Sequence, residues 1–127
     1  EILDGGLVKS AAVMSWRGMK GGIQAAKMGH EVVMTPAEFV YVDYMQGDAA
    51  FEPHVYSSLR LKKTYQFDPV PVGVDPKLIK GGQANIWTEQ IYNMRHMRYM
   101  VWPRGFAIAE VLWSPKEKRN WNDFSRI

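Results

Sequence analysis

The sequence predicts an α/β fold with parallel strands, and two observations carry this prediction. Short apolar runs alternate along the chain with segments whose apolar residues recur at helical spacing. The connections in the first strand–helix–strand unit span about four residues or fewer, as in parallel βαβ units. The 127 residues, 46% hydrophobic and 23% charged, are enough for one small domain with a core.

The first predicted unit spans residues 11–36. Its first strand is the apolar run AAVMSW, which ends at the glycine-rich turn RGMKGG. The next segment, GGIQAAKMGH, is predicted to be a helix, with Gly29 at the position after a helix end where glycine is favoured. The second strand is EVVMTP, which Pro36 stops.

Beyond this unit, residues 52–76 are irregular and proline-rich. This pattern predicts either a long functional loop or a crossover connection with inserted segments. A short helix is predicted within it, in HVYSSLRLKKTY. A third strand is predicted in LIKGGQANIW, residues 78–87. Two helices are predicted to follow, in NMRHMRYMVW and in PRGFAIAEVLWS, the latter with Pro103 at a favoured first position. No internal repeat is visible.

Aromatic and polar side chains follow each predicted strand. Parallel α/β sheets and (β/α)8 barrels build their sites at the carboxyl ends of their strands, so we expect these side chains to form one site. A flat tryptophan beside a carboxylate suits a sugar, because the ring packs on the C–H face while the carboxylate accepts hydrogen bonds from hydroxyls. The side chains are those of Trp16 and Arg17, of Tyr41 and Asp43, and of Trp87 and Glu89.

Each of these residues taken alone also has a purely structural explanation. Trp16 could be a core residue. Tyr41 could serve packing or carry a solvated hydroxyl. Asp43 and Glu89 could be helix caps or surface charges. Only their joint placement after three strands favours a site.

Several other classes of protein and site are disfavoured. The net charge is +3, but the basic residues are scattered apart from RLKK and KEKR, which we interpret as solvated faces rather than a nucleic-acid surface. The chain has no cysteine, and His30, His54 and His96 lack the spacing of a metal site. The segment GMKGG lacks the spacing of a phosphate or dinucleotide loop. No run is long enough for a membrane span, and no cofactor is implied.

Two charged residues in the last predicted helix need partners. Arg104 lies in the first turn, where a cation opposes the helix dipole, and Glu110 lies in the apolar run AIAEVLW. We predict that tertiary ion pairs hold both side chains, either with each other or with a neighbouring helix, and we favour this structural role over a site role.

The motifs together resemble a known family. The chain contains, in this order and with family-like spacing, the motifs SWRG, YVD, WTE and PRGFAIAEVLWS. Together they resemble the C-terminal part of the catalytic domain of glycoside hydrolase family 20, the β-N-acetylhexosaminidases. The resemblance covers nearly the whole chain and is to bacterial members of Bacteroidetes type. It implies that residues 1–127 are a partial catalytic domain supplying roughly the last three βα units of a (β/α)8 barrel. It also implies an exported protein, either periplasmic, secreted or attached to the outer membrane.

The resemblance further implies a role for each candidate site residue. Trp16 would wall the pocket for the acetamido group of the substrate, and the Tyr41 hydroxyl would donate a hydrogen bond to the acetamido carbonyl. Asp43 and Glu89 would bind hydroxyls of the terminal sugar. Trp87 would stack under the sugar ring.

The mechanism implied by the resemblance is substrate-assisted retention, in which the 2-acetamido oxygen attacks the anomeric carbon and forms an oxazolinium ion. A glutamate acts as general acid and then base, and the preceding aspartate orients the acetamido nitrogen. Family members carry this pair upstream, in a motif like H-x-GGDE, and this sequence contains no such motif. An arginine near the first strand and a further pocket tryptophan of the family are also absent from this sequence.

Three hypotheses follow. The parent protein is a β-N-acetylhexosaminidase acting on N-acetylhexosamine-terminated glycans; the chain is a carbohydrate-binding module without catalysis; or it is a structural fragment without a ligand. Both ends of the sequence look like cuts, so we expect a fragment. Because the Asp–Glu pair of the family is missing from it, we expect that it does not hydrolyse substrate alone. A partial barrel leaves sheet edges and an apolar face uncovered, so we expect it to self-associate or to need its missing half. The sequence does not distinguish glucosamine from galactosamine, nor one linkage from another.

Overall fold

The computed structural model describes residues 2–126, which divide into two compact units. The first unit comprises residues 1–37 and 69–83, and the second comprises residues 38–68 and 84–127. The polypeptide crosses between them three times, and each unit is described by itself.

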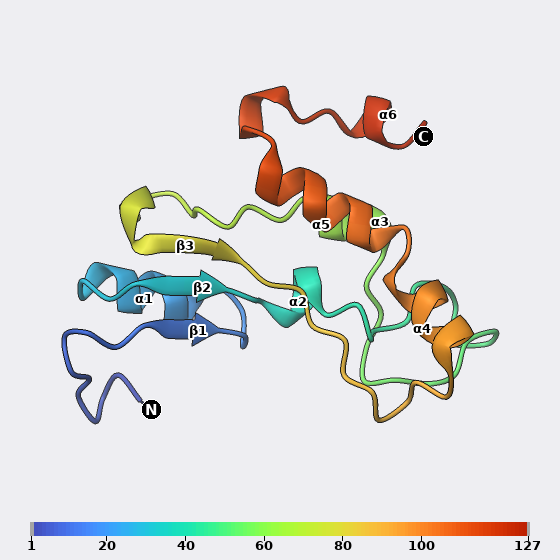
Figure 1. Cartoon of the computed structure of the whole chain (residues 1–127), viewed down its shortest axis with the longest axis horizontal. Coiled ribbons are helices and arrows are strands. Elements are labelled where there is room, and N and C mark those ends of the chain that lie inside the picture. The colour runs from blue at the N-terminus through green and yellow to red at the C-terminus, as the bar shows by residue number, and fades with distance from the viewer. Residues whose placement is uncertain (1, 127) are drawn as a thin grey trace. The chain divides into compact units, whose positions relative to one another are not determined.

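The first unit contains a parallel sheet of three strands in the order β1-β2-β3 (Figure 1). The strands are β1 (Val13–Ser15), β2 (Val32–Met34) and β3 (Ile79–Gly82). Helix α1 (Lys20–Lys27) connects β1 to β2 and packs on both strands. The predicted strand–helix–strand unit is therefore confirmed, including a left-handed glycine, Gly29, just after the helix.

The core of the first unit lies between α1 and the sheet. The buried side chains come from the inner face of the helix and from alternate residues of β2; they are Ala25, Ala26, Val32 and Met34. Gly22 lies where the helix comes closest to the sheet, because a Cβ atom there would stand 2.7 Å from the sulfur of Met34. Small residues on α1 thus allow the helix to contact the sheet directly.

The third strand is shorter than predicted. It ends at Gly82, and residues 78–87 do not form one continuous strand. The register shifts between Val32 and Val33, which pair with Ile79 and Gly81, so Lys80 is left without a partner in the ladder. Gly81, just after this irregularity, has a positive φ of 133°. A short 3₁₀ helix, η1 (Pro76–Leu78), leads into β3.

The second unit is mainly helical. It contains α3 (Leu61–Tyr65), α4 (Met94–Val101), α5 (Arg104–Trp113) and α6 (Trp121–Phe124), so the helices predicted around residues 93–114 are confirmed. Helix α5 packs against α3 and α4 (Figure 1). Its buried face contributes Arg104, Ala107, Ile108 and Val111 to the core.

A short helix separates the second strand from the residues expected to follow it directly. Helix α2 (Ala37–Val40) begins just after Pro36, and Tyr41 comes after its last residue. Another 3₁₀ helix, η2 (Lys116–Lys118), connects α5 to α6. In the described part of the chain, no helix is long and apolar enough to cross a membrane.

Candidate functional site

Two segments of the second unit lie side by side and carry four of the predicted site residues. Tyr41 and Asn85 form an isolated parallel bridge. The N–H of Val42 donates to the carbonyl of Asn85 at 2.9 Å, and the N–H of Asn85 donates to the carbonyl of Val40 at 3.1 Å. Tyr41 and Asp43 on one segment therefore come next to Trp87 and Glu89, which follow Asn85 on the other.

Asp43 is the buried carboxylate of this site, with only 3% of its surface exposed. Its carboxylate takes part in backbone hydrogen bonds with its own N–H and with that of Trp87. The oxygen Oδ1 is buried and finds no hydrogen-bond partner among residues 2–126. Buried polar atoms are nearly always hydrogen-bonded, so this oxygen has an unused capacity to accept a hydrogen bond.

The charge of Asp43 is destabilised by its surroundings. Burial raises the pKa of the Asp43 carboxyl above 3.8, and the nearby Glu89 carboxylate raises it further. The backbone hydrogen bonds and the charge of Arg104 act in the opposite direction on this pKa, but they do not cancel the effect of burial. A donor hydroxyl supplied by a ligand would favour the ionised form.

Tyr41 is buried at the start of the same segment. Its ring packs on that of Tyr44, with centroids 5.8 Å apart and planes inclined by 59°. Within residues 2–126 the Tyr41 hydroxyl has no hydrogen-bond partner. Packing holds the ring while the hydroxyl keeps its capacity to donate.

Trp87 and Glu89 are exposed, in contrast to Asp43. Trp87 leaves 53% of its surface in contact with solvent, which is unusual for so large an apolar side chain. The N–H of Ile91 donates to the carbonyl of Thr88 at 3.1 Å, so the chain turns just after Trp87, and Glu89 lies in this turn. The second unit thus presents one open aromatic face together with one exposed and one buried carboxylate.

Trp16 belongs to the first unit, where it follows β1 and is 48% exposed. The guanidinium carbon of Arg17 lies 4.7 Å from the centroid of its ring. The backbone carbonyl of Trp16 accepts a hydrogen bond from the N–H of Ala37 at 3.0 Å. Just before it, the Ser15 hydroxyl donates to the carbonyl of Gly18 at 2.7 Å and accepts from the N–H of Gly22 at 2.9 Å, which fixes the turn that follows the strand.

The structure differs from the ion pairs predicted for Arg104 and Glu110. Arg104 is fully buried, but its guanidinium donates to four backbone carbonyls, those of Val42, Tyr44, Leu59 and Met100. Glu110 is half-buried and joins no ion pair within residues 2–126. The prediction failed for Arg104 because irregular backbone, which sequence patterns do not reveal, can satisfy a cation as fully as a carboxylate does.

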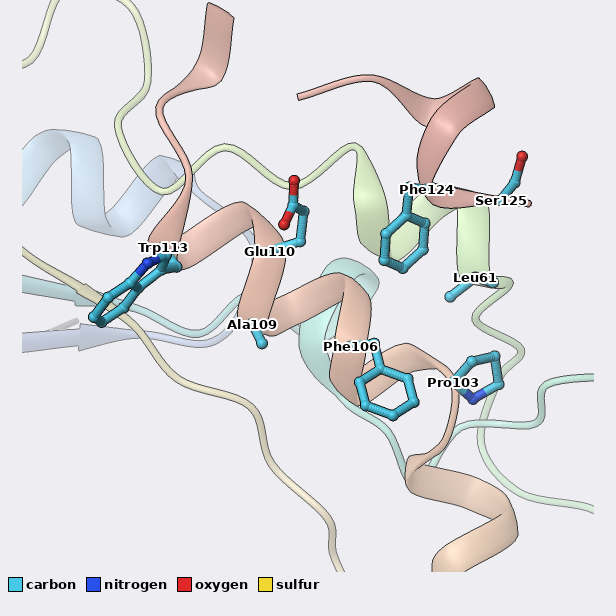
Figure 2. Close-up of a pocket in the computed structure, with 8 residues that line it drawn as sticks. All are labelled: Leu61, Pro103, Phe106, Ala109, Glu110, Trp113, Phe124 and Ser125. Carbon is cyan, nitrogen blue, oxygen red and sulfur yellow. The ribbon is translucent and has the colours of Figure 1, made fainter. Parts of the chain in front are cut away.

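Glu110 instead lies in an apolar pocket of about 640 Å³ in the second unit. Figure 2 shows that one helix, α5, supplies most of its wall, and that Leu61 and Phe124 come from α3 and α6. Phe106 and Trp113 are 59% and 91% exposed. The complete lining is Leu61, Pro103, Phe106, Ala109, Glu110, Trp113, Phe124 and Ser125.

A hydrogen-bond network that the sequence did not indicate ties the loop after Tyr44 to α4. Glu52 accepts from the N–H of Gln46 at 2.8 Å and from the Tyr99 hydroxyl at 2.5 Å. The Gln46 amide donates to the carbonyls of Tyr99 and Trp102. Apart from the bond between Gln46 and Glu52, these contacts join residues about fifty positions apart, so no local spacing in the sequence could have revealed them. For Arg104, by contrast, the sequence did carry a local signal, because a cation in the first turn of a helix opposes the helix dipole and needs a partner.

No cluster of three or more histidine, aspartate or glutamate side chains in the described part of the chain is placed to hold a metal ion. The groups gathered in the second unit are an exposed indole, two carboxylates and a tyrosine hydroxyl. Such a set can bind a polar ring through its apolar face and its hydroxyls.

Comparison with known proteins gives a consistent result. The sequence profile of "Glycosyl hydrolase family 20, catalytic domain" matches residues 1–116. A β-hexosaminidase from Porphyromonas gingivalis is 42% identical over 131 residues, which cover 99% of this chain and 17% of the relative. A β-N-acetylhexosaminidase from Cellulomonas fimi is 34% identical over 107 residues, covering 81% of this chain and 21% of the relative. The chain thus spans about a fifth of the length of these relatives.

Solved structures agree in fold. An exo-β-N-acetylglucosaminidase from Vibrio harveyi in complex with N-acetylglucosamine matches with a TM-score of 0.84 and 36% identity, over 94% of this chain and 20% of that one. An N-acetyl-β-hexosaminidase from Streptomyces plicatus matches with a TM-score of 0.82 over 97% of this chain and 27% of that one. At 23% identity, the second match is evidence for the fold alone.

Proposed function

Because the chain belongs to glycosyl hydrolase family 20, as part of its catalytic domain, we propose that the complete protein removes terminal N-acetylhexosamine residues from glycans. Within it, residues 1–127 form part of the (β/α)8 barrel and bind the terminal sugar. The observation that carries this proposal is the buried Oδ1 atom of Asp43, an unpaired acceptor next to the exposed Trp87. The relative from Vibrio harveyi was solved with N-acetylglucosamine bound, which supports the same class of ligand.

The binding roles follow from exposure and hydrogen-bonding capacity. Trp87 offers an open indole face for the C–H face of the sugar ring. The carboxylates of Asp43 and Glu89 accept hydrogen bonds from sugar hydroxyls. The free hydroxyl of Tyr41 donates to the acetamido carbonyl. For Trp16, in the first unit, the role in acetamido binding rests on the resemblance to the family alone.

For the reaction we propose substrate-assisted retention. The acetamido oxygen of the substrate attacks the anomeric carbon as the bond to the leaving oxygen breaks, and that oxygen takes a proton from a general acid. Water then opens the oxazolinium ion and gives its proton to the same group. The Tyr41 hydroxyl would stabilise and orient the attacking acetamido group. The Asp–Glu pair, of which the glutamate is the general acid and then the base, is proposed to lie in a part of the protein outside residues 1–127.

A second candidate function applies to the chain taken alone. Binding without hydrolysis is favoured by the sequence itself, which carries sugar-binding groups but no GGDE-like motif. The isolated chain would then be a carbohydrate-binding or purely structural piece. Titration of the isolated chain with N-acetylglucosamine or its thiazoline distinguishes these two, because only the binding piece gives a saturable signal.

The proposed function is tested with the complete protein and aryl N-acetyl-β-glucosaminide and N-acetyl-β-galactosaminide substrates. We expect hydrolysis of at least one of them and tight inhibition by N-acetylglucosamine thiazoline, which mimics the oxazolinium ion. A protein that cleaves the corresponding aryl glucoside, lacking the acetamido group, as fast as the N-acetylated substrate would contradict substrate assistance.

A further inference from the structure

We propose that Arg104 is a positioning residue for the sugar site, because its guanidinium holds the backbone on both sides of Asp43. The inference rests on the proposed function, in which the Asp43 carboxylate binds sugar hydroxyls. It assigns to Arg104 a role in ligand binding that goes beyond the stability of the helix in which it lies.

The hydrogen bonds of Arg104 are directed at the neighbours of Asp43. Nη2 donates to the carbonyl of Val42 at 2.6 Å, and Nη1 donates to that of Tyr44 at 2.7 Å. These two residues stand immediately before and after Asp43. The Val42 carbonyl belongs to the peptide plane that ends at the Asp43 Cα atom, and the Tyr44 carbonyl belongs to the plane between Tyr44 and Met45. The two hydrogen bonds therefore hold the backbone on both sides of Asp43 and restrict the direction of its side chain.

The remaining donors of Arg104 anchor the guanidinium itself. Nη1 also donates to the carbonyl of Leu59 at 3.1 Å, and Nε donates to that of Met100 at 3.1 Å. The guanidinium is therefore held by α4 and by the segment before α3 while it holds residues 42–44. A planar group with five N–H donors in fixed directions can make all these bonds together, and an ammonium cannot.

The segment that carries Asp43 needs such an anchor. Residues 42–44 form turns and a bend, so the carbonyls of Val42 and Tyr44 have no sheet partners to accept from. Buried carbonyls without donors are costly, and Arg104 supplies the missing donors from the centre of the unit. The same contacts that satisfy the backbone therefore determine where the carboxylate lies.

The guanidinium keeps its charge in this position. Burial lowers the pKa of Arg104 to about 10, while the charges of Glu52, Asp43 and Tyr99 act in the opposite direction. The group is thus protonated at neutral pH. Its charge in turn favours the ionised form of Asp43, which is the form that accepts hydrogen bonds from hydroxyls.

The test is a double-mutant cycle in the complete protein, with Arg104→Lys, Asp43→Ala and the two combined. Misplacement of a binding group by about 1 Å can cost on the order of 10²-fold in activity, so we expect a loss of this order in kcat/KM for Arg104→Lys. In the Asp43→Ala background the same change should cost only a few-fold, because the positioned group is already gone. Arg98→Lys, at an exposed arginine of α4, is the matched control, and it should leave kcat/KM unchanged in both backgrounds.

An equal loss in both backgrounds would overturn the proposal, since it would mean that Arg104 acts independently of Asp43. If Arg104→Lys does not fold, the cycle is repeated with Arg104→Gln, which keeps a planar donor. If neither variant folds, Arg104 is a structural residue only and the proposal is wrong.

A second measurement separates this proposal from the proposed function. Hydrogen exchange is compared between the unmodified protein and Arg104→Lys, and we expect exchange of the amides of residues 42–45 to quicken more than that of the rest of the second unit. If the unmodified protein hydrolyses no N-acetylhexosaminide, the proposed function fails, and the exchange experiment still decides the anchoring role. Unchanged exchange at residues 42–45 would overturn that role.

Discussion

The carboxylate of Asp43 accepts a hydrogen bond from the backbone N–H of Trp87, a residue on the neighbouring segment. This contact links a buried anion to the backbone of an exposed indole, and it leaves the oxygen Oδ1 without a partner in residues 2–126. The polar and the aromatic parts of the proposed sugar site are therefore held in one arrangement by the backbone.

Asp43→Asn should weaken sugar binding and stabilise the fold. Hydrogen bonds to charged groups contribute ~1.5–3 kcal/mol, so the change should raise KM or Kd by roughly 10–10²-fold. Burial raises the folded-state pKa of Asp43 above 3.8, so the native state binds the proton more tightly than the unfolded chain does. The Asp43 contribution to stability therefore falls as pH rises from about that value through the raised pKa.

Thermal unfolding of the complete protein, followed from acid to neutral pH, checks this prediction. The Asn variant does not ionise at position 43, so it avoids the loss of stability that the ionisation of buried Asp43 causes at neutral pH. It should therefore melt at a higher temperature than the unmodified protein at neutral pH. A variant that melts lower at neutral pH, with binding unchanged, would contradict both the pKa direction and the binding role.

Trp87→Ala should remove the aromatic floor of the site. Trp87 is 53% exposed, so little packing is lost, whereas contact with the sugar ring would bury apolar area worth about 1.5 kcal/mol or more, roughly 10-fold in affinity. Calorimetric titration with N-acetylglucosamine measures the loss. Tyr56→Ala, at an exposed aromatic outside the proposed site, is the control and should bind as the unmodified protein does.

The 127-residue chain alone should not hydrolyse aryl N-acetylglucosaminides. It contains no GGDE-like motif, and loss of general acid–base catalysis alone costs about 10²–10⁴-fold. Release of the aryl group by the purified chain, followed by absorbance, is the measurement. Turnover above the buffer rate that thiazoline inhibits would sink the prediction.

The same isolated chain should self-associate through the outer face of α5. Phe106 and Trp113 are 59% and 91% exposed beside the pocket in Figure 2, and exposed apolar surface of this kind favours association. Phe106→Ser combined with Trp113→Ser should shift the chain towards the monomer in size-exclusion chromatography over a dilution series. Tyr92→Ser, at an exposed aromatic outside α5, is the control, and a dilution-insensitive monomer for the unmodified chain would refute the idea.

Gly22→Ala should destabilise the first unit. A Cβ atom there would stand 2.7 Å from Met34 Sδ and 2.9 Å from Ser15 Cβ, and overpacking of this kind costs about 1–3 kcal/mol. Gly21→Ala is the matched control on the same helix, because its Cβ would meet only Ser15 Oγ at 3.7 Å, and alanine favours the helix by ~1 kcal/mol. The midpoint temperature of thermal unfolding should thus be lower for Gly22→Ala than for the unmodified protein, and it should not be lowered for Gly21→Ala.

Much of the fold could be predicted because its signals are local. The apolar runs that became β1 and β2, the helix ending before Gly29, and α5 between Pro103 and Ser114 each follow from spacing within a dozen residues. The third strand was predicted too long, since the apolar pattern continues past Gly82, the last residue that pairs with β2. Helix α2 was missed because its four residues are too few to show helical periodicity.

The sequence by itself determined which chemical groups this protein offers for the proposed site: Trp16, Tyr41, Asp43, Trp87 and Glu89, in a parallel α/β context. Only the tertiary structure decided that Asp43 is buried with a free oxygen while Trp87 is exposed. It also decided that Arg104 binds carbonyls 60 and 62 positions away, those of Tyr44 and Val42, where an ion pair was predicted. The physical reason is range: periodicity and turn chemistry act over a few residues, whereas burial and the partners of a buried charge depend on segments that meet only in the folded chain.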